Sequence, residues 1–137
     1  MTGRAIVVRS LAEAEAALAA ATALGVPVTL LSAENAASSV GPLWFRALIA
    51  QAGAAYPEAR VSAILDCGDR PGSAAAALRL GFTLIRFAGR GRAGEAITAI
   101  AAEAGAEILT RRPEALDLAG LPDLRAACEA WLDEAPG

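Results

Sequence analysis

The stretch Val61-Ser-Ala-Ile-Leu-Asp-Cys-Gly68 decides how this 137-residue chain folds. Its apolar and β-branched residues predict a short buried strand over 61–66, which ends in a carboxylate and is followed by a thiol. The segment Asp69-Arg-Pro-Gly-Ser73 then predicts a turn and a helix, which stops at Gly81. Open α/β sheets and (β/α) barrels keep their chemistry at the carboxyl ends of such strands. Asp66 and Cys67 are therefore the first candidate site.

Strand and helix patterns alternate on both sides of this stretch. The strands are expected over 5–8, 26–31, 61–66, 82–87 and 106–110, and the helices over 10–24, 42–56, 69–81, 93–104 and from about 122 onward. Residues 32–41 predict a loop, and residues 113–118 a short helical turn. Five strands that alternate with helices predict an α/β fold with a five-stranded parallel sheet and right-handed crossovers. We expect half of a TIM barrel or an open flavodoxin-like sheet, with the C-terminal helix packed on it.

The composition indicates one globular domain over 1–137. Apolar residues make up 55% of the chain and aromatic residues 4%, so the core is expected to consist mainly of small and aliphatic side chains. The net charge of −3 gives no reason to expect a nucleic-acid or membrane partner, and no apolar run is long enough to span a membrane. Two cysteines in unlike contexts are typical of reduced thiols in a cytoplasmic protein.

The chain has no histidine and no lysine, and all 12 basic residues are arginine. This excludes histidine-based triads and imidazole zinc sites. It also excludes Schiff-base chemistry, pyridoxal phosphate attachment and a Walker-type phosphate loop. The composition is typical of a GC-rich bacterial genome. These exclusions favour a protein that is not an enzyme and that uses no cofactor.

Three segments within 5–89 resemble the N-terminal half of the class II, zinc-dependent fructose-bisphosphate aldolases. They are Gly25-Val-Pro-Val-Thr-Leu-Leu-Ser32, Ile64-Leu-Asp-Cys-Gly68 and Gly81-Phe-Thr-Leu-Ile-Arg-Phe-Ala-Gly89. The resemblance implies aldolase-like βα units, with Asp66 at the position of the catalytic aspartate and Ser32 near the substrate phosphate. Cys67 takes the place of a zinc-binding histidine, and Ala88 that of an aspartate. The later zinc histidines have no counterpart in residues 106–134, so we expect no metal.

Asp66 and Cys67 each allow two interpretations. Asp66 is either a catalytic carboxylate that survives in a pocket, or a residue that satisfies loop N–H groups. Cys67 either helps to hold a metal or is a small buried apolar residue. Neighbouring residues of a strand point to opposite faces, so the two share a site only if the strand has ended at Asp66. A nucleophilic thiol would also need a basic neighbour, which only arginine can supply here.

Arginines also follow several of the expected strands. They are Arg9, Arg70, Arg86, Arg90, Arg92, Arg111 and Arg112. Because the carboxyl ends of parallel strands share one edge, these guanidinium groups either converge to bind a phosphate or carboxylate, or pair with Glu34, Asp66, Asp69 and Glu107. We select Arg9, Arg86, Arg90 and Arg111, with Ser32, as candidate ligand-binding residues. The glycine-rich run 89–94 only superficially resembles a dinucleotide loop.

Three functions remain open from the sequence. The first is a non-catalytic aldolase-like domain that binds a small anionic, phosphorylated metabolite at the strand C-terminal rim. The second is a residual lyase that uses Asp66 as an acid or base. The third is a structural homo-oligomerisation module, since exposed strand edges and an apolar helix face with Trp131 are usually covered.

Overall fold

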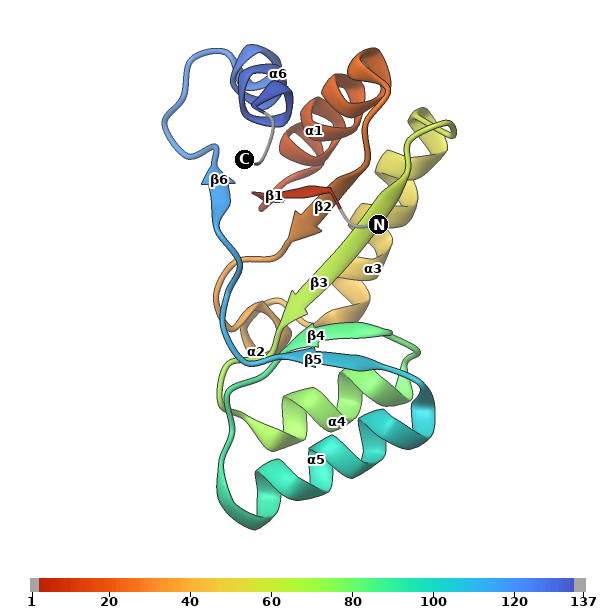
Figure 1. Cartoon of the computed structure of the whole chain (residues 1–137), viewed down its shortest axis with the longest axis vertical. Helices are drawn as coiled ribbons and strands as arrows, with labels where there is room; N and C mark the ends of the chain where they lie inside the picture. Colours follow the sequence, from red (N-terminus) through yellow and green to blue (C-terminus); the bar gives the residue numbers. More distant parts are fainter. Residues whose placement is uncertain (1–2, 135–137) are drawn as a thin grey trace. The chain divides into compact units, whose positions relative to one another are not determined.

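A computed structural model describes residues 3–134, which form two compact units (Figure 1). The first unit contains residues 3–31, 46–63 and 113–134, and the second contains residues 32–45 and 64–112. Two elements contribute to both units: the helix α3 (Pro42–Ala55) and the strand β3 (Val61–Asp66). The expectation of a single domain stays a prediction.

The described residues contain six strands and not the expected five. The strands are β1 (Arg4–Val7), β2 (Val28–Leu31), β3, β4 (Leu84–Arg86), β5 (Glu107–Leu109) and β6 (Ala115–Asp117). Their order is β5-β4-β3-β2-β1-β6. The pairs β1–β2, β1–β6, β3–β4 and β4–β5 are all parallel. The prediction of an α/β fold with a parallel sheet and alternating helices is therefore confirmed, whereas the choice between half-barrel and open sheet stays a prediction.

In the first unit, two helices pack against each other and the C-terminal one contacts the sheet. These helices are α1 (Leu11–Leu24) and α6 (Leu124–Asp133), which lie side by side in Figure 1. The inner surface of α1 is built mostly from alanines, which let a neighbouring element approach closely. The Nε1–H of Trp131 in α6 donates to the carbonyl of Ala5 in β1 at 2.9 Å. The expected packing of the C-terminal helix on the sheet is thus present within this unit.

One half of the predicted capping box is present at the start of α1, and the other half differs. The Ser10 hydroxyl accepts a hydrogen bond from the Glu13 N–H at 3.2 Å, as the capping-box spacing predicts. The Glu13 carboxylate, however, accepts from the N–H of Arg9 at 2.7 Å, one residue before the cap residue. At the other end, Gly25 adopts a φ of 69° and ends the helix as expected.

The sixth strand replaces the helical turn that the sequence predicted over 113–118. In β6, Ala115, Leu116 and Asp117 pair with Ala5, Ile6 and Val7 of β1. Without this partner, one edge of β1 would keep unpaired N–H and carbonyl groups, and a three-residue segment is enough to cover it. So short a run carries no clear period, and the sequence pattern alone does not separate strand from helix there.

The second unit is built on the parallel strands β3, β4 and β5. Its helices are α2 (Ala36–Ser39), the first turn of α3, α4 (Pro71–Arg79) and α5 (Gly91–Ala104). The last two pack against each other, and Figure 1 shows them side by side along β4 and β5. Pro71 is the first residue of α4, and Gly81, with a φ of 91°, follows the end of that helix as predicted. The short helix α2 lies where the sequence predicted only a loop.

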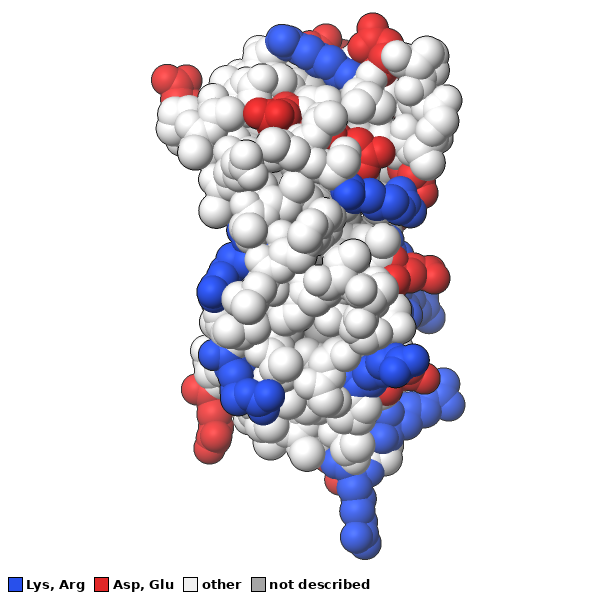
Figure 2. Space-filling view, turned by 180° about the vertical axis from the view of Figure 1, so that it is seen from behind, with Lys and Arg blue, Asp and Glu red and all other residues white. Residues whose placement is uncertain are grey.

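Figure 2 shows both acidic and basic side chains on this face of the molecule. Several basic side chains lie beside acidic ones, and a group of basic side chains gathers toward the lower right of the view. Among the described residues, no helix is long and apolar enough to cross a membrane.

We expect the contacts of Trp131 with β1 to contribute measurably to the free energy of unfolding. The Trp131 ring also lies 3.4 Å from the guanidinium carbon of Arg4. We expect Trp131→Phe to lower the free energy of unfolding in urea by about 1–2 kcal/mol, because it removes the hydrogen bond to Ala5 and weakens the cation–π contact. Trp44→Phe is the matched control, since Trp44 is 40% exposed, and should change stability by less than about 0.5 kcal/mol. Equal effects of the two variants would contradict this assignment.

Candidate functional site

The candidate site lies in the second unit, at the carboxyl end of β3. Asp66 is the last residue of this strand, and its side chain is fully buried. One carboxylate oxygen, Oδ1, accepts hydrogen bonds from the N–H of Gly68 at 2.8 Å and from the N–H of Asn35 at 3.0 Å. The Asp66 N–H in turn donates to the hydroxyl of Ser32 at 2.9 Å. The carboxylate and amide of one residue therefore fix the loop that follows β2 and the turn that follows β3.

Two arginines contact the second carboxylate oxygen of Asp66. Arg112 Nη1 donates to Oδ2 at 2.6 Å, and Arg86 Nη1 lies 3.6 Å from the same oxygen. Arg86 reaches it because it ends β4, directly opposite Asp66 in the parallel register. Arg112 reaches it from the segment that follows β5. Asp66, Arg86 and Arg112 thus form an ion cluster around one buried carboxylate, called here the arginine–aspartate cluster.

Each arginine of the arginine–aspartate cluster is also held by a backbone carbonyl. Arg112 Nη1 donates to Ser32 O at 3.2 Å, and Arg86 Nε donates to Thr110 O at 3.3 Å. The Arg86 and Arg112 side chains are 22% and 19% exposed, whereas Asp66 is 0% exposed. The guanidinium groups therefore cover the carboxylate on the solvent side while each keeps a small part of its own surface accessible.

Cys67 does not share this site with Asp66. Its N–H donates to Arg86 O at 2.8 Å, which continues the pairing with β4, and its sulfur lies 3.8 Å from Leu65 O. Burial, together with the negative charge of Asp66, raises the pKa of the Cys67 thiol from 9.0 to about 12. A protonated, fully buried thiol is a poor nucleophile at neutral pH. The geometry agrees with the interpretation of Cys67 as a small buried residue.

The donors that the aldolase resemblance would need for zinc do not fit a metal here. The sulfur of Cys67 lies near the carbonyl of Leu65 in β3. In the resemblance to class II aldolases, Ala88 takes the position of an aspartate. Within residues 3–134, no three Cys, Asp or Glu side chains come together in a way that could hold a metal ion.

The structure brings together three of the six candidate residues. Ser32, Asp66 and Arg86 lie in contact, as expected for residues at the ends of parallel strands. Ser32 is 1% exposed, and its hydroxyl donates to Ala33 O at 3.2 Å while it accepts from Asp66, so it supports the aspartate and does not face solvent. Arg111 is exposed.

Arg9 belongs to the first unit and has a partner of its own. Its two Nη atoms lie 2.8 and 3.2 Å from the two carboxylate oxygens of Asp117. These hydrogen bonds raise the pKa of the Arg9 guanidinium. Arg9 is therefore paired, but its partner Asp117 is not one of the four acidic residues that the sequence indicated.

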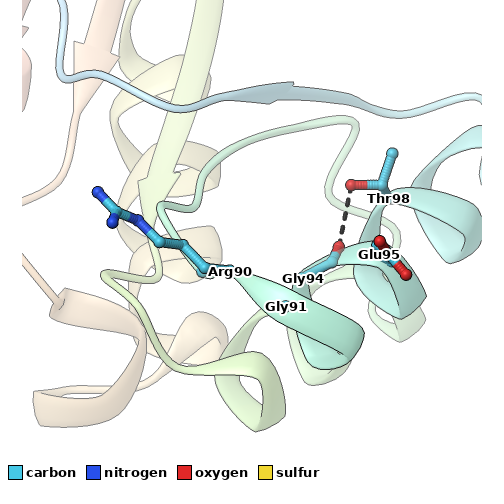
Figure 3. Close-up of a pocket in the computed structure, with 6 residues that line it drawn as sticks. Arg90, Gly91, Gly94, Glu95 and Thr98 are labelled. Carbon is cyan, nitrogen blue, oxygen red and sulfur yellow. Dashed lines mark hydrogen bonds between the residues drawn. The ribbon is translucent and has the colours of Figure 1, made fainter.

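Arg90 lines a hollow of about 370 Å³ at the start of α5 (Figure 3). Its side chain extends away from Gly94, Glu95 and Thr98, which line the rest of the hollow. The Thr98 hydroxyl donates to Gly94 O at 3.0 Å, and Glu95 adds a negative charge. No two basic side chains converge among the residues that line this hollow, so the arginine–aspartate cluster is the stronger candidate.

Sequence reasoning named Arg112 among the strand-end arginines but selected Arg111 in its place. The signal was the Arg111-Arg112 pair after the fifth strand. The side chains of two adjacent residues point in different directions, so the residue at which β5 ends decides which arginine turns toward β4. β5 ends at Leu109, one residue before the predicted boundary. The sequence pattern leaves such a boundary uncertain by more than one residue.

No protein-family model matches this chain, and no curated protein matches it either. The resemblance to class II aldolases rests on the three short segments quoted above and stays a prediction. The geometry of the arginine–aspartate cluster is therefore interpreted from its own chemistry.

Removing the charge of Asp66 should destabilise the protein strongly. We expect Asp66→Asn to lower the free energy of unfolding by about 3 kcal/mol, because two partly buried guanidinium groups lose their counter-ion. Asp69→Asn is the matched control: Asp69 is exposed three residues further on and should contribute less than about 0.5 kcal/mol. Urea denaturation measures both variants. An Asp66→Asn protein as stable as the parent would show that the cluster is not a structural constraint.

The two buried thiols predict a loss of stability at alkaline pH. Burial, with Glu13 and Glu129 as lesser causes, raises the pKa of Cys128 to about 11, while Cys67 reaches about 12. Unfolded-state thiols lose their protons near pH 9.0 whereas the folded ones keep them, so stability is fully present below that pH and falls above it. We expect the free energy of unfolding to fall by about 2–3 kcal/mol between pH 8 and pH 10.

The double variant Cys67→Ala, Cys128→Ala is the control for this pH dependence. It lacks both thiols, so its stability should fall much less between the same two pH values, whatever its stability at pH 8. An equal fall in parent and variant would assign the effect to other groups. Urea denaturation under reducing conditions gives both values.

Proposed function

We propose that this chain binds a small anionic metabolite, of the phosphorylated class, at the arginine–aspartate cluster, without chemistry on Asp66. One observation carries the proposal: two guanidinium groups converge on a single buried carboxylate, so the cluster keeps one unit of positive charge beyond what Asp66 neutralises. An anion that approaches the cluster would complete its charge balance. Planar guanidinium groups recognise phosphate and carboxylate oxygens through paired hydrogen bonds.

Both arginines keep donors for such a ligand. Arg86 uses Nε and Nη1, and Arg112 uses Nη1 for its hydrogen bonds, so the Nη2 group of each makes no hydrogen bond with the residues that the structure describes. The side chains are about one-fifth exposed. Because Asp66 and the backbone carbonyls already hold them in place, ligand binding would cost little side-chain entropy.

The alternative of a residual lyase finds less support in this geometry. An acid or base must exchange a proton with substrate, whereas both oxygens of Asp66 already accept hydrogen bonds and the residue is fully buried. To act as a base, Asp66 would have to release Arg112 at 2.6 Å. We therefore assign Asp66 the positioning of the two arginines.

Self-association stays a prediction. Val40, Leu43 and Trp44 are large apolar side chains of the second unit that are 40–57% exposed, and a surface of this kind agrees with an interface. Nothing in the structure says what covers it.

Arg86 is the residue that tests the proposal. We expect inorganic phosphate, compared with sodium chloride at equal ionic strength, to raise the melting temperature of the parent by about 4 °C at ten times its Kd. A hexose phosphate should do the same at lower concentration. Arg86→Gln should weaken phosphate binding at least about tenfold, because it removes one of two charge-assisted contacts.

Arg79→Gln is the matched control for Arg86→Gln. It removes the same charge from an exposed position at the end of α4, in the same unit, and should leave phosphate affinity unchanged. Absence of any stabilisation of the parent by either phosphate compound would refute the proposed function, as would equal losses in the two variants.

A further inference from the structure

A fourth charged residue, Glu34, lies beside Arg112 of the arginine–aspartate cluster. Its Oε1 is 3.9 Å from Arg112 Nε, while its side chain is 79% exposed. This distance is too long for a hydrogen bond, so the contact is an ion pair that charge alone holds. An exposed pair of this kind contributes little free energy and is easily displaced.

The loop places Glu34 at this point through its neighbours. Ser32 and Asn35 both bond to Asp66, the first through its hydroxyl and the second through its N–H. The backbone of Glu34 is thus fixed between two residues that are anchored to the cluster, while its side chain projects into solvent. Asn35 adopts a φ of 56°, which turns the chain sharply after Glu34.

The carboxylate of Glu34 cancels the net positive charge of the arginine–aspartate cluster. Arg86 and Arg112 carry two positive charges, and Asp66 and Glu34 carry two negative ones, so the four groups are neutral together. When Glu34 swings away, the cluster regains one positive charge and the Nε edge of Arg112 becomes accessible. The carboxylate of Glu34 therefore lies beside the edge of Arg112 that makes no hydrogen bond with the described residues.

We propose that Glu34 is an intramolecular competitor for the anion site, so that a ligand binds by displacing its carboxylate from Arg112. This inference rests on the proposed function, and it assigns Glu34 the control of affinity at that site. The alternative role, in which Glu34 accepts hydrogen bonds from the hydroxyl groups of a bound polyol phosphate, predicts the opposite effect of its removal.

Glu34→Gln separates these roles. We expect it to tighten the binding of inorganic phosphate about three- to fivefold in an NMR titration, because an exposed ion pair no longer has to be broken. Glycerol phosphate should gain by a similar factor. Glu103→Gln is the matched control: it removes an equal charge from an exposed position of α5 and should change either affinity by less than about 1.5-fold.

NMR also gives a second measurement, which reports directly on the contact between Glu34 and Arg112. The Nε–H resonance of Arg112 should move on Glu34→Gln, because the carboxylate beside it is removed, and phosphate should move the same resonance in both proteins. If the parent binds phosphate but Glu34→Gln leaves affinity unchanged, or weakens glycerol phosphate, the competitor role is wrong while the anion site stands. If neither parent nor Glu34→Gln binds phosphate, the proposed function fails and this inference with it.

Discussion

The second unit depends on the burial of one negative charge. A carboxylate removed from water costs several kcal/mol unless cations and hydrogen-bond donors replace its hydration. Asp66 is fully buried, and its donors come from four separate segments: the loop after β2, the turn after β3, the end of β4 and the chain after β5. Each of these segments must be in place for the charge to be tolerated. The carboxylate therefore ties these four segments together.

The absence of lysine matters for how this charge is compensated. Arg112 holds the Asp66 carboxylate, the Ser32 carbonyl and Glu34 with one planar group, and Arg86 similarly divides its donors between Asp66 and Thr110. A lysine carries a single compact ammonium and lacks this fixed fork of donors. Replacement of arginine by lysine would preserve the charge but not the shared contacts, so the cluster is specific to guanidinium chemistry.

Strand and helix periodicity predicts much of the fold. Much of the site follows from one rule of topology: the carboxyl ends of parallel strands lie at the same edge of the sheet. Alternating strand and helix patterns predicted parallel pairing, and parallel pairing predicted that Ser32, Asp66 and Arg86 meet. The strand β6 and the helix α2 were missed because segments of three or four residues carry no readable period. The choice of Arg112 over Arg111, and the neutralisation of Asp66, depend on side-chain directions at strand ends, which tertiary contacts decide.

The same contacts are the reason we propose binding, and not acid–base chemistry, for this site. Asp66 is fully buried and its oxygens already accept three hydrogen bonds, so a substrate proton could reach them only after these contacts open. Without Asp66, however, the two guanidinium groups would repel each other and would not stay ordered at one edge of the sheet. The residue that opposes catalysis is thus the one that organises the positive charge. The net charge of the cluster is small, so under the proposed function a nearby carboxylate such as Glu34 is enough to change how strongly the site attracts an anion.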